Sequence, residues 1–79
     1  MVDLNESAKA LEVQIGGNHY KGMKIQPVEF IYMNEIPYLE GNIIKYVCRH
    51  ADKGRAEDLK KAKHYIDLII SMQYGEKVD

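Results

Sequence analysis

The sequence predicts a small all-α fold, a bundle of two principal antiparallel helices with one or two short helices and an N-terminal loop or arm. Three observations support this prediction. The chain has 79 residues, a length that suffices for one small domain. Apolar residues recur at helical spacing in two long stretches. Each of the two prolines precedes an apolar pattern, at the position where a helix accepts proline best.

The chain is expected to comprise an N-terminal arm at 1–15, a helical domain at 16–74 and a C-terminal tail at 75–79. The arm carries Ala8, Leu11 and Ile15 at helical spacing, so it is either a short helix docked on a neighbour or a frayed end. Three glycines between positions 16 and 22 then indicate unusual backbone dihedral angles or a close approach to another group.

A short apolar helix is expected from Pro27 to about Asn34, with Asn34 closing it in a left-handed conformation. The next helix begins at residue 37 or 38 and runs to about His50. Gly41 within it costs about 0.5–1 kcal/mol relative to alanine, so we expect a tight helix contact or a ligand there. The buried stripe of this helix is expected at Leu39, Ile43, Ile44, Val47 and Cys48.

The last helix is expected from about Arg55 to Gln73 or Tyr74, after a connection in which Gly54 stops one helix or opens the next. Because that connection is short, the two long helices should pack antiparallel. The buried stripe of the last helix is predicted to hold Leu59, Ala62, Ile66, Ile69 and Gln73, widened by Tyr65, Leu68 and Met72.

Charge is unevenly placed along the chain. Residues 41–64 carry seven cations against three anions, a net charge of +4, whereas the rest of the chain carries −5. A local positive field on a small protein indicates an anionic partner of limited size. Duplex nucleic acid is not expected, because its binding rests on many phosphate contacts over a broad basic surface.

Composition also bounds the compartment and the assembly. The single cysteine, Cys48, excludes an internal disulfide framework and a cysteine-rich zinc fold, and fits a reducing compartment. No apolar stretch approaches the roughly 18 residues of a membrane span, and the acidic start of the sequence is unlike a signal peptide. We therefore expect a protein of the cytoplasm with no membrane partner. At this length a lone core is marginal, so a homo-oligomer is expected.

The strongest candidate site combines two helices. Asn42, Lys45 and Arg49 share one polar stripe, and the polar edge of the last helix should converge with it. Arginine and lysine bind phosphate oxygens, and an amide reads a base edge or a ribose hydroxyl. The alternative is that these are solvated faces of amphipathic helices, as charge runs usually are. The residues that the last helix would contribute are Lys60, Lys61, Lys63 and His64.

The glycine-rich loop before the first helix is a second candidate. Its backbone N–H groups could contact a phosphate, with Lys21 nearby, His19 beside it and Tyr20 available to stack on a base. The loop lacks the spacing of a phosphate-binding P-loop, and a tight turn followed by a packed tyrosine is the structural alternative. Further tyrosines considered for stacking are Tyr38 and Tyr46.

Metal and nucleophile sites have weaker support. Zinc ligands could come from His19, Cys48, His50 and His64, but Cys48 is better explained as a small buried core residue than as a ligand or nucleophile. Mg²⁺ could be held by Glu40, Glu57, Asp58 and Asp67, but these acids are too dispersed to match the helical nucleotide pyrophosphohydrolases. No cofactor is expected, and Mg²⁺ would be needed only by an enzyme.

Four ordered motifs resemble the signature of a small phage-encoded family of largely unassigned function. They are Gly16–Lys21, Ile25–Ile31, Glu40–Arg49 and Glu57–Ala62, and the resemblance covers about residues 16–70. A related segment occurs in a coliphage nucleotide kinase that lacks a recognisable P-loop. The resemblance implies a phage origin, action in the cytoplasm of an infected bacterium, and nucleotides as ligands. It assigns no role to any single residue.

The leading hypothesis is therefore a phage protein that binds a nucleotide or a nucleotide-derived signalling molecule, and sequesters it to counter host defence. Lys45, Arg49 and Lys60 would hold the phosphates. The base or sugar would be oriented by His19, Tyr20, Lys21 and Asn42. Two alternatives stay open: an enzyme that phosphorylates or hydrolyses nucleotides, and a protein that inhibits a host enzyme by direct contact.

Overall fold

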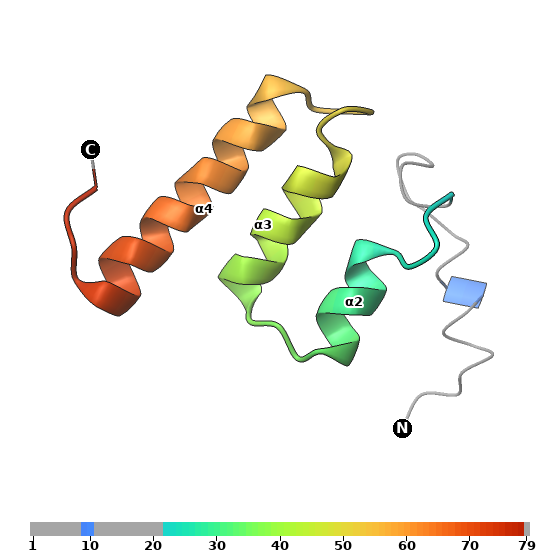
Figure 1. Ribbon diagram of the computed structural model, residues 1–79, viewed down its shortest axis with the longest axis horizontal. Coiled ribbons are helices and arrows are strands. Elements are labelled where there is room, and N and C mark those ends of the chain that lie inside the picture. Colours follow the sequence, from blue (N-terminus) through green and yellow to red (C-terminus); the bar gives the residue numbers. More distant parts are fainter. Residues whose placement is uncertain (1–8, 11–21, 79) are drawn as a thin grey trace.

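The computed structural model describes residues 9–10 and 22–78. The part from residue 22 to residue 78 contains three helices and no strand (Figure 1). They are α2 (Pro27–Met33), α3 (Tyr38–Arg49) and α4 (Ala56–Tyr74). The two longer helices, α3 and α4, run antiparallel and are joined by a short turn, as Figure 1 shows. The prediction of an all-α fold built on two antiparallel helices is confirmed.

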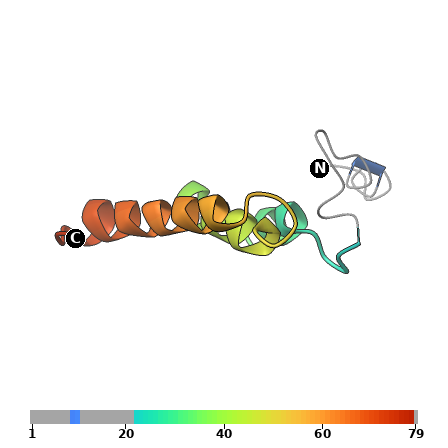
Figure 2. The same cartoon turned by 90° about the horizontal axis from the view of Figure 1, so that it is seen from above.

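The three helices lie side by side in one layer. In Figure 1, α3 lies between α2 and α4, and the view turned by 90° in Figure 2 shows the layer edge-on. Apart from Pro27 at the start of α2, Ala62 on α4 is the only apolar side chain of the described part that is buried. A single layer gives each helix only one or two neighbours, so both faces of the layer keep apolar side chains in contact with solvent.

α2 begins and ends with local hydrogen bonds. At its start, the Glu29 carboxylate accepts a hydrogen bond from the Gln26 N–H at 3.3 Å. The prediction that Asn34 adopts a left-handed conformation is wrong, because Asn34 has φ −95° and Glu35 has φ 52°. The Ile36 N–H then donates to the Ile31 carbonyl, which is the 6→1 bond of a Schellman motif. The Asn34 side-chain amide instead donates to the Phe30 carbonyl.

Gly41 allows α2 and α3 to approach closely. A Cβ at Gly41 would lie 3.1 Å from Cγ2 of Ile31, so this glycine serves a tight helix contact, one of the two explanations expected from the sequence. Two residues of the predicted buried stripe of α3 are in contact with solvent. Val47 is 47% exposed, and Cys48 is exposed, so the expectation of a buried core cysteine is wrong.

The buried side of α4 differs from the predicted stripe. Asp58 and Ala62 are fully buried, whereas Leu59 and Ile66 are 43% and 44% exposed. The stripe is narrower than predicted because α4 has only α3 beside it in the described part of the chain. α4 ends at Gly75, whose φ of 67° is the left-handed conformation typical of a helix C-terminus. None of the described helices combines the length and the apolar character that a membrane span requires.

A basic, tyrosine-lined groove between α3 and α4

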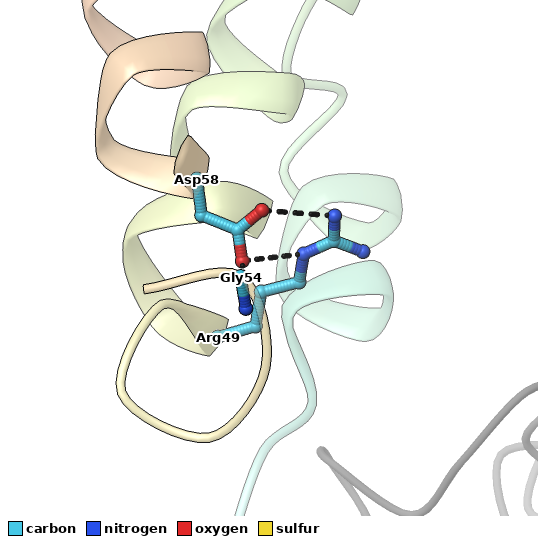
Figure 3. Close-up of polar contacts among 3 residues, drawn as sticks. All are labelled: Arg49, Gly54 and Asp58. Atoms are coloured by element: carbon cyan, nitrogen blue, oxygen red, sulfur yellow. Dashed lines mark hydrogen bonds and ion pairs between the residues drawn. The ribbon is translucent and has the colours of Figure 1, made fainter. Parts of the chain in front are cut away.

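A buried ion pair joins the end of α3 to the start of α4. Arg49 Nε and Nη2 donate to the two oxygens of Asp58, each at 3.0 Å, and the Gly54 N–H donates to Asp58 Oδ2 at 3.0 Å (Figure 3). The Asp58 side chain is 1% exposed. The hydrogen bonds from Arg49 lower the pKa of the Asp58 carboxyl below its ordinary value and outweigh the loss of solvation, which acts in the opposite direction.

The turn between the helices is shaped around this carboxylate. A Cβ at Gly54 would overlap the Asp58 carboxyl group, so glycine is required there by close approach and not by its dihedral angles. The positive φ of the turn belongs to Arg55, at 53°. Gly54 therefore lies in the connection between the helices, but the caps are His50 and Arg55, so Gly54 serves the close approach to Asp58 and is not itself a helix stop or start.

Cations from both helices gather around Tyr46. Lys45 Nζ lies 4.4 Å from the centre of the Tyr46 ring, the Arg49 guanidinium carbon 4.7 Å, and Lys61 Nζ 5.5 Å. Contacts of this kind are attractive, because the face of an aromatic ring carries partial negative charge. The Tyr46 ring therefore brings three positively charged side chains close together at the surface of the protein. The predicted convergence of the polar edges of the two helices is present for Lys45, Arg49 and Lys61.

Tyr46 and Lys61 line a shallow groove of about 440 Å³, and Lys45 and Arg49 lie against the Tyr46 ring beside it. Its lining residues are Tyr46, Lys60, Lys61, His64, Tyr65 and Leu68. The Tyr65 ring stacks on Tyr46 with centroids 6.0 Å apart and meets Tyr38 edge-on at 6.4 Å. Loss of solvation, together with the neighbouring Tyr38, raises the pKa of the Tyr65 hydroxyl above its ordinary value, so Tyr65 stays neutral at physiological pH. The groove thus combines cations with neutral aromatic surface.

A second hollow, of about 380 Å³, lies between α2 and α3. Its apolar lining is formed by Pro27, Val28, Ile31, Ile36, Pro37, Tyr38 and Gly41. Asn42 and Lys45 supply its polar side, and the Asn42 side-chain amide donates to the Tyr38 carbonyl at 2.8 Å. Lys45 lines this hollow, and its ammonium also contacts the Tyr46 ring of the groove. Tyr38 lines the hollow as well, and its ring contacts Tyr65 of the groove. The hollow and the groove therefore adjoin at Lys45 and Tyr38.

The residues predicted from the sequence fall into three groups. Lys45 and Arg49 both contact the Tyr46 ring, but Arg49 also forms an ion pair with Asp58. Asn42 lines the apolar hollow, and Lys60 lines the groove while its ammonium lies 3.6 Å from the exposed Glu57 carboxylate. His19, Tyr20 and Lys21 lie outside the described residues, as does the whole glycine-rich loop to position 21.

Tyr65 was not among the site residues predicted from the sequence. The helical pattern predicts it as part of the buried stripe of the last helix, yet this half-buried ring lines the groove and stacks on Tyr46. The signal that could have found it is the spacing of Lys61, Tyr65 and Leu68 at i, i+4 and i+7, which places them on one side of a helix. Within residues 9–10 and 22–78, no group of three or more His, Cys, Asp or Glu side chains is arranged to hold a metal ion.

Fold and site together define a small protein of layered helices with a basic, tyrosine-lined groove on one face. Residues 15–67 match the DUF3310 family, described as proteins of unknown function, and the chain belongs to this family. No curated protein and no solved structure matches the chain.

Proposed function

We propose that the protein binds a nucleotide or a nucleotide-derived signalling molecule in the groove between α3 and α4. The observation that carries the proposal is the convergence of Lys45, Arg49 and Lys61, from two helices, on the face of Tyr46. Such a gathering of like charges is unfavourable unless an anion or an aromatic ring compensates it. A phosphate group is the anion that matches clustered lysine and arginine donors.

Lys45 and Lys61 are the residues that would hold the phosphates. The Asp58 carboxylate already engages Arg49, so the positive charge of Arg49 is largely balanced. No carboxylate ion pair involves Lys45 or Lys61 among the described residues. Lys60 and His64 would add positive charge at the rim of the groove. The main phosphate contacts of this proposal are therefore Lys45 and Lys61, whereas the sequence-based hypothesis named Lys45, Arg49 and Lys60.

The tyrosines and the apolar hollow supply the surface for a base. Aromatic rings bind nucleobases by stacking, worth about 1–3 kcal/mol per base. Tyr65 lines the groove, and Tyr38 extends the aromatic surface into the apolar hollow beside it. Asn42, at the polar side of that hollow, could read a base edge or a sugar hydroxyl. A groove of about 440 Å³ is within the usual range for small ligands.

The proposed mode of action is sequestration, in which the ligand is held and released unchanged. The acidic residues close to the groove support this choice, because Asp58 binds Arg49 and Gly54, and Glu57 lies beside Lys60. Phosphoryl transfer needs carboxylates that hold Mg²⁺ against the phosphates. In a phage protein, as the resemblance of its motifs implies, holding a signalling nucleotide would counter host defence.

A thermal-shift screen against mono-, di- and cyclic nucleotides tests the proposal. A bound nucleotide raises the melting temperature in proportion to its binding free energy, and we expect the rise to vanish in Lys45→Ala and Lys61→Ala. Lys63→Ala is the matched control, because Lys63 stands on the same helix outside the groove lining and loses the same charge. Equal shifts in all three variants would contradict the proposed site.

Recovery of the ligand separates sequestration from catalysis. The nucleotide giving the largest shift is incubated with the protein and Mg²⁺, and the mixture is then denatured and analysed by mass spectrometry. We expect the nucleotide to be recovered intact, in a fixed ratio to the chain. Phosphorylated or hydrolysed product that depends on Lys61 would show an enzyme instead of a binding protein.

A further inference from the structure

Two concave regions flank α3, which Figure 1 shows between the other two helices. The apolar hollow is lined from α2 and α3, and the groove from α3 and α4. Lys45 contacts both, because it lines the hollow while its ammonium lies against the Tyr46 ring of the groove. Tyr38 joins them one helical stretch earlier, since it lines the hollow and its ring meets Tyr65. A phosphate held at Lys45 therefore has a concave surface on each side of it.

The hollow suits an uncharged ring better than a phosphate. Its wall is apolar except at Asn42 and Lys45, so a phosphate inside it would lose water and find few donors in exchange. Val28 and Tyr38 are 58% and 75% exposed, and a flat ring placed against them would remove apolar surface from water. A ligand whose phosphate contacts Lys45 would therefore place a base in the hollow.

The groove offers a place for a second base. Lys60 and Lys61 lie in the second turn of α4, whereas Tyr65 and Leu68 follow about one and two turns after Lys61. The groove is therefore basic toward the start of α4 and becomes aromatic and apolar farther along the helix. A base stacked on Tyr65 would leave its phosphate beside Lys61, on the side that faces Tyr46 and the hollow beyond it.

The charge of this surface limits the charge of its ligand. Four permanent cations lie on it, namely Lys45, Arg49, Lys60 and Lys61. Asp58 offsets one of these charges through its hydrogen bonds to Arg49, and the Glu57 carboxylate beside Lys60 offsets a second. The remaining charge of +2 matches two phosphates that carry one negative charge each. A nucleoside triphosphate brings more negative charge than this surface balances.

We infer that the ligand is a dinucleotide, in which two phosphates with one negative charge each bridge two bases. This inference rests on the proposed function and specifies its ligand. One base lies in the hollow against Tyr38, and the other lies on Tyr65 in the groove. The phosphates between them contact Lys45 and Lys61. A nucleotide with a single base would leave either the hollow or the aromatic part of the groove in contact with water.

Isothermal titration calorimetry on the full-length protein tests the inference with probes of similar charge. Diadenosine pyrophosphate and cyclic di-AMP represent the two ways of bridging two bases with two such phosphates. AMP, with a charge of about −1.5 to −2, carries a similar charge on one base, and ATP carries a larger one. The guanine counterparts of all four probes complete the set. We expect one of the dinucleotides to bind once per chain and about tenfold or more tightly than AMP, GMP, ATP or GTP, because a second base is stacked.

Val28→Glu tests the hollow without altering the proposed phosphate contacts. Val28 lines the hollow, and a carboxylate there should remove the roughly tenfold preference for the dinucleotide over the mononucleotide of similar charge. Met33→Glu is the matched control, because Met33 is 70% exposed on the same helix, lies outside the hollow lining and gains the same charge. The control should keep the preference, and circular dichroism should show the same helical spectrum for both variants.

The outcomes separate this inference from the proposed function. Mononucleotides that bind as tightly as every dinucleotide would overturn the inference, and so would an unchanged preference in Val28→Glu. The proposed function would survive either result if mononucleotide binding is lost in Lys61→Ala. Failure of all the probes to bind would contradict the inference and the proposed function together.

Discussion

Arg49 and Asp58 join the last turn of α3 to the first turn of α4 through two parallel hydrogen bonds of 3.0 Å (Figure 3). The pair lies beside the groove, since the same guanidinium also contacts the face of Tyr46. It thereby fixes how the two basic helices approach each other. The proposed phosphate contacts, Lys45 and Lys61, depend on that approach because they stand on different helices.

Removal of the Arg49 side chain should destabilise the fold strongly. Arg49→Ala leaves the Asp58 carboxylate buried without its ion-pair partner, and an isolated buried charge costs more than the pair contributes. We expect a larger drop in melting temperature than for any lysine variant of the groove. The double variant Arg49→Leu/Asp58→Leu should recover part of the loss. A wild-type melting temperature for Arg49→Ala would contradict the role of the pair.

Stability should also depend on pH through Asp58. Its pKa in the folded state is lowered, so the unfolded chain binds this proton more readily as the pH falls. The stabilisation is fully present above the ordinary carboxyl pKa of about 3.9 and is lost as the pH falls toward the lower folded-state value. Urea unfolding between pH 3 and 6 should show a smaller acid-induced loss in Arg49→Leu/Asp58→Leu than in the wild type. Parallel pH profiles for the two proteins would exclude Asp58 as the source.

Gly54→Ala should reduce stability by about 1–3 kcal/mol, because its methyl group overlaps the Asp58 carboxylate and the turn must shift. Chemical denaturation measures the change. Gly22→Ala is the matched control, since a Cβ at Gly22 meets nothing within 4 Å. If both alanine variants had the same free energy of unfolding, the close approach at Gly54 would not exist.

Glu35→Gly should stabilise the protein by about 1 kcal/mol, because Glu35 holds a left-handed φ of 52° that disfavours any residue with a side chain. The neighbouring Asn34→Gly should act in the opposite direction, since Asn34 has an ordinary φ and its side chain caps the Phe30 carbonyl. Thermal unfolding of the two variants compares them directly. A loss of stability in Glu35→Gly would show that the side chain has a contact outweighing its strain.

Helix positions could be predicted from the sequence because they depend on local signals. Pro27 and Pro37 mark the starts of α2 and α3, and Gly75 marks the end of α4. Burial could not be predicted in the same way, because an apolar stripe shows which side of a helix prefers contact but not whether a neighbour is present. Cys48 and Leu59 follow helical spacing and are nevertheless exposed in a layer one helix thick.

The candidate site was predictable only in part for a related reason. Lys45 and Arg49 share a stripe that the sequence displays, and the short connection predicts that Lys61 approaches them. The pairing of Arg49 with Asp58 could not be read from their spacing of nine residues, because it depends on the shape of the turn at Gly54. Asp58 therefore looked like a candidate ligand for Mg²⁺ when it is the partner of an arginine.

The most direct test of the proposed function is a titration followed by nuclear magnetic resonance on the ¹⁵N-labelled protein. The titrant is the nucleotide that gives the largest thermal shift, with inorganic phosphate as a comparison. We predict saturable changes in the amide signals of Lys45, Tyr46, Lys61 and Tyr65 with the nucleotide, and their loss in Lys61→Ala. Changes confined to residues outside the groove, or an unchanged response in Lys61→Ala, would contradict nucleotide binding in the groove.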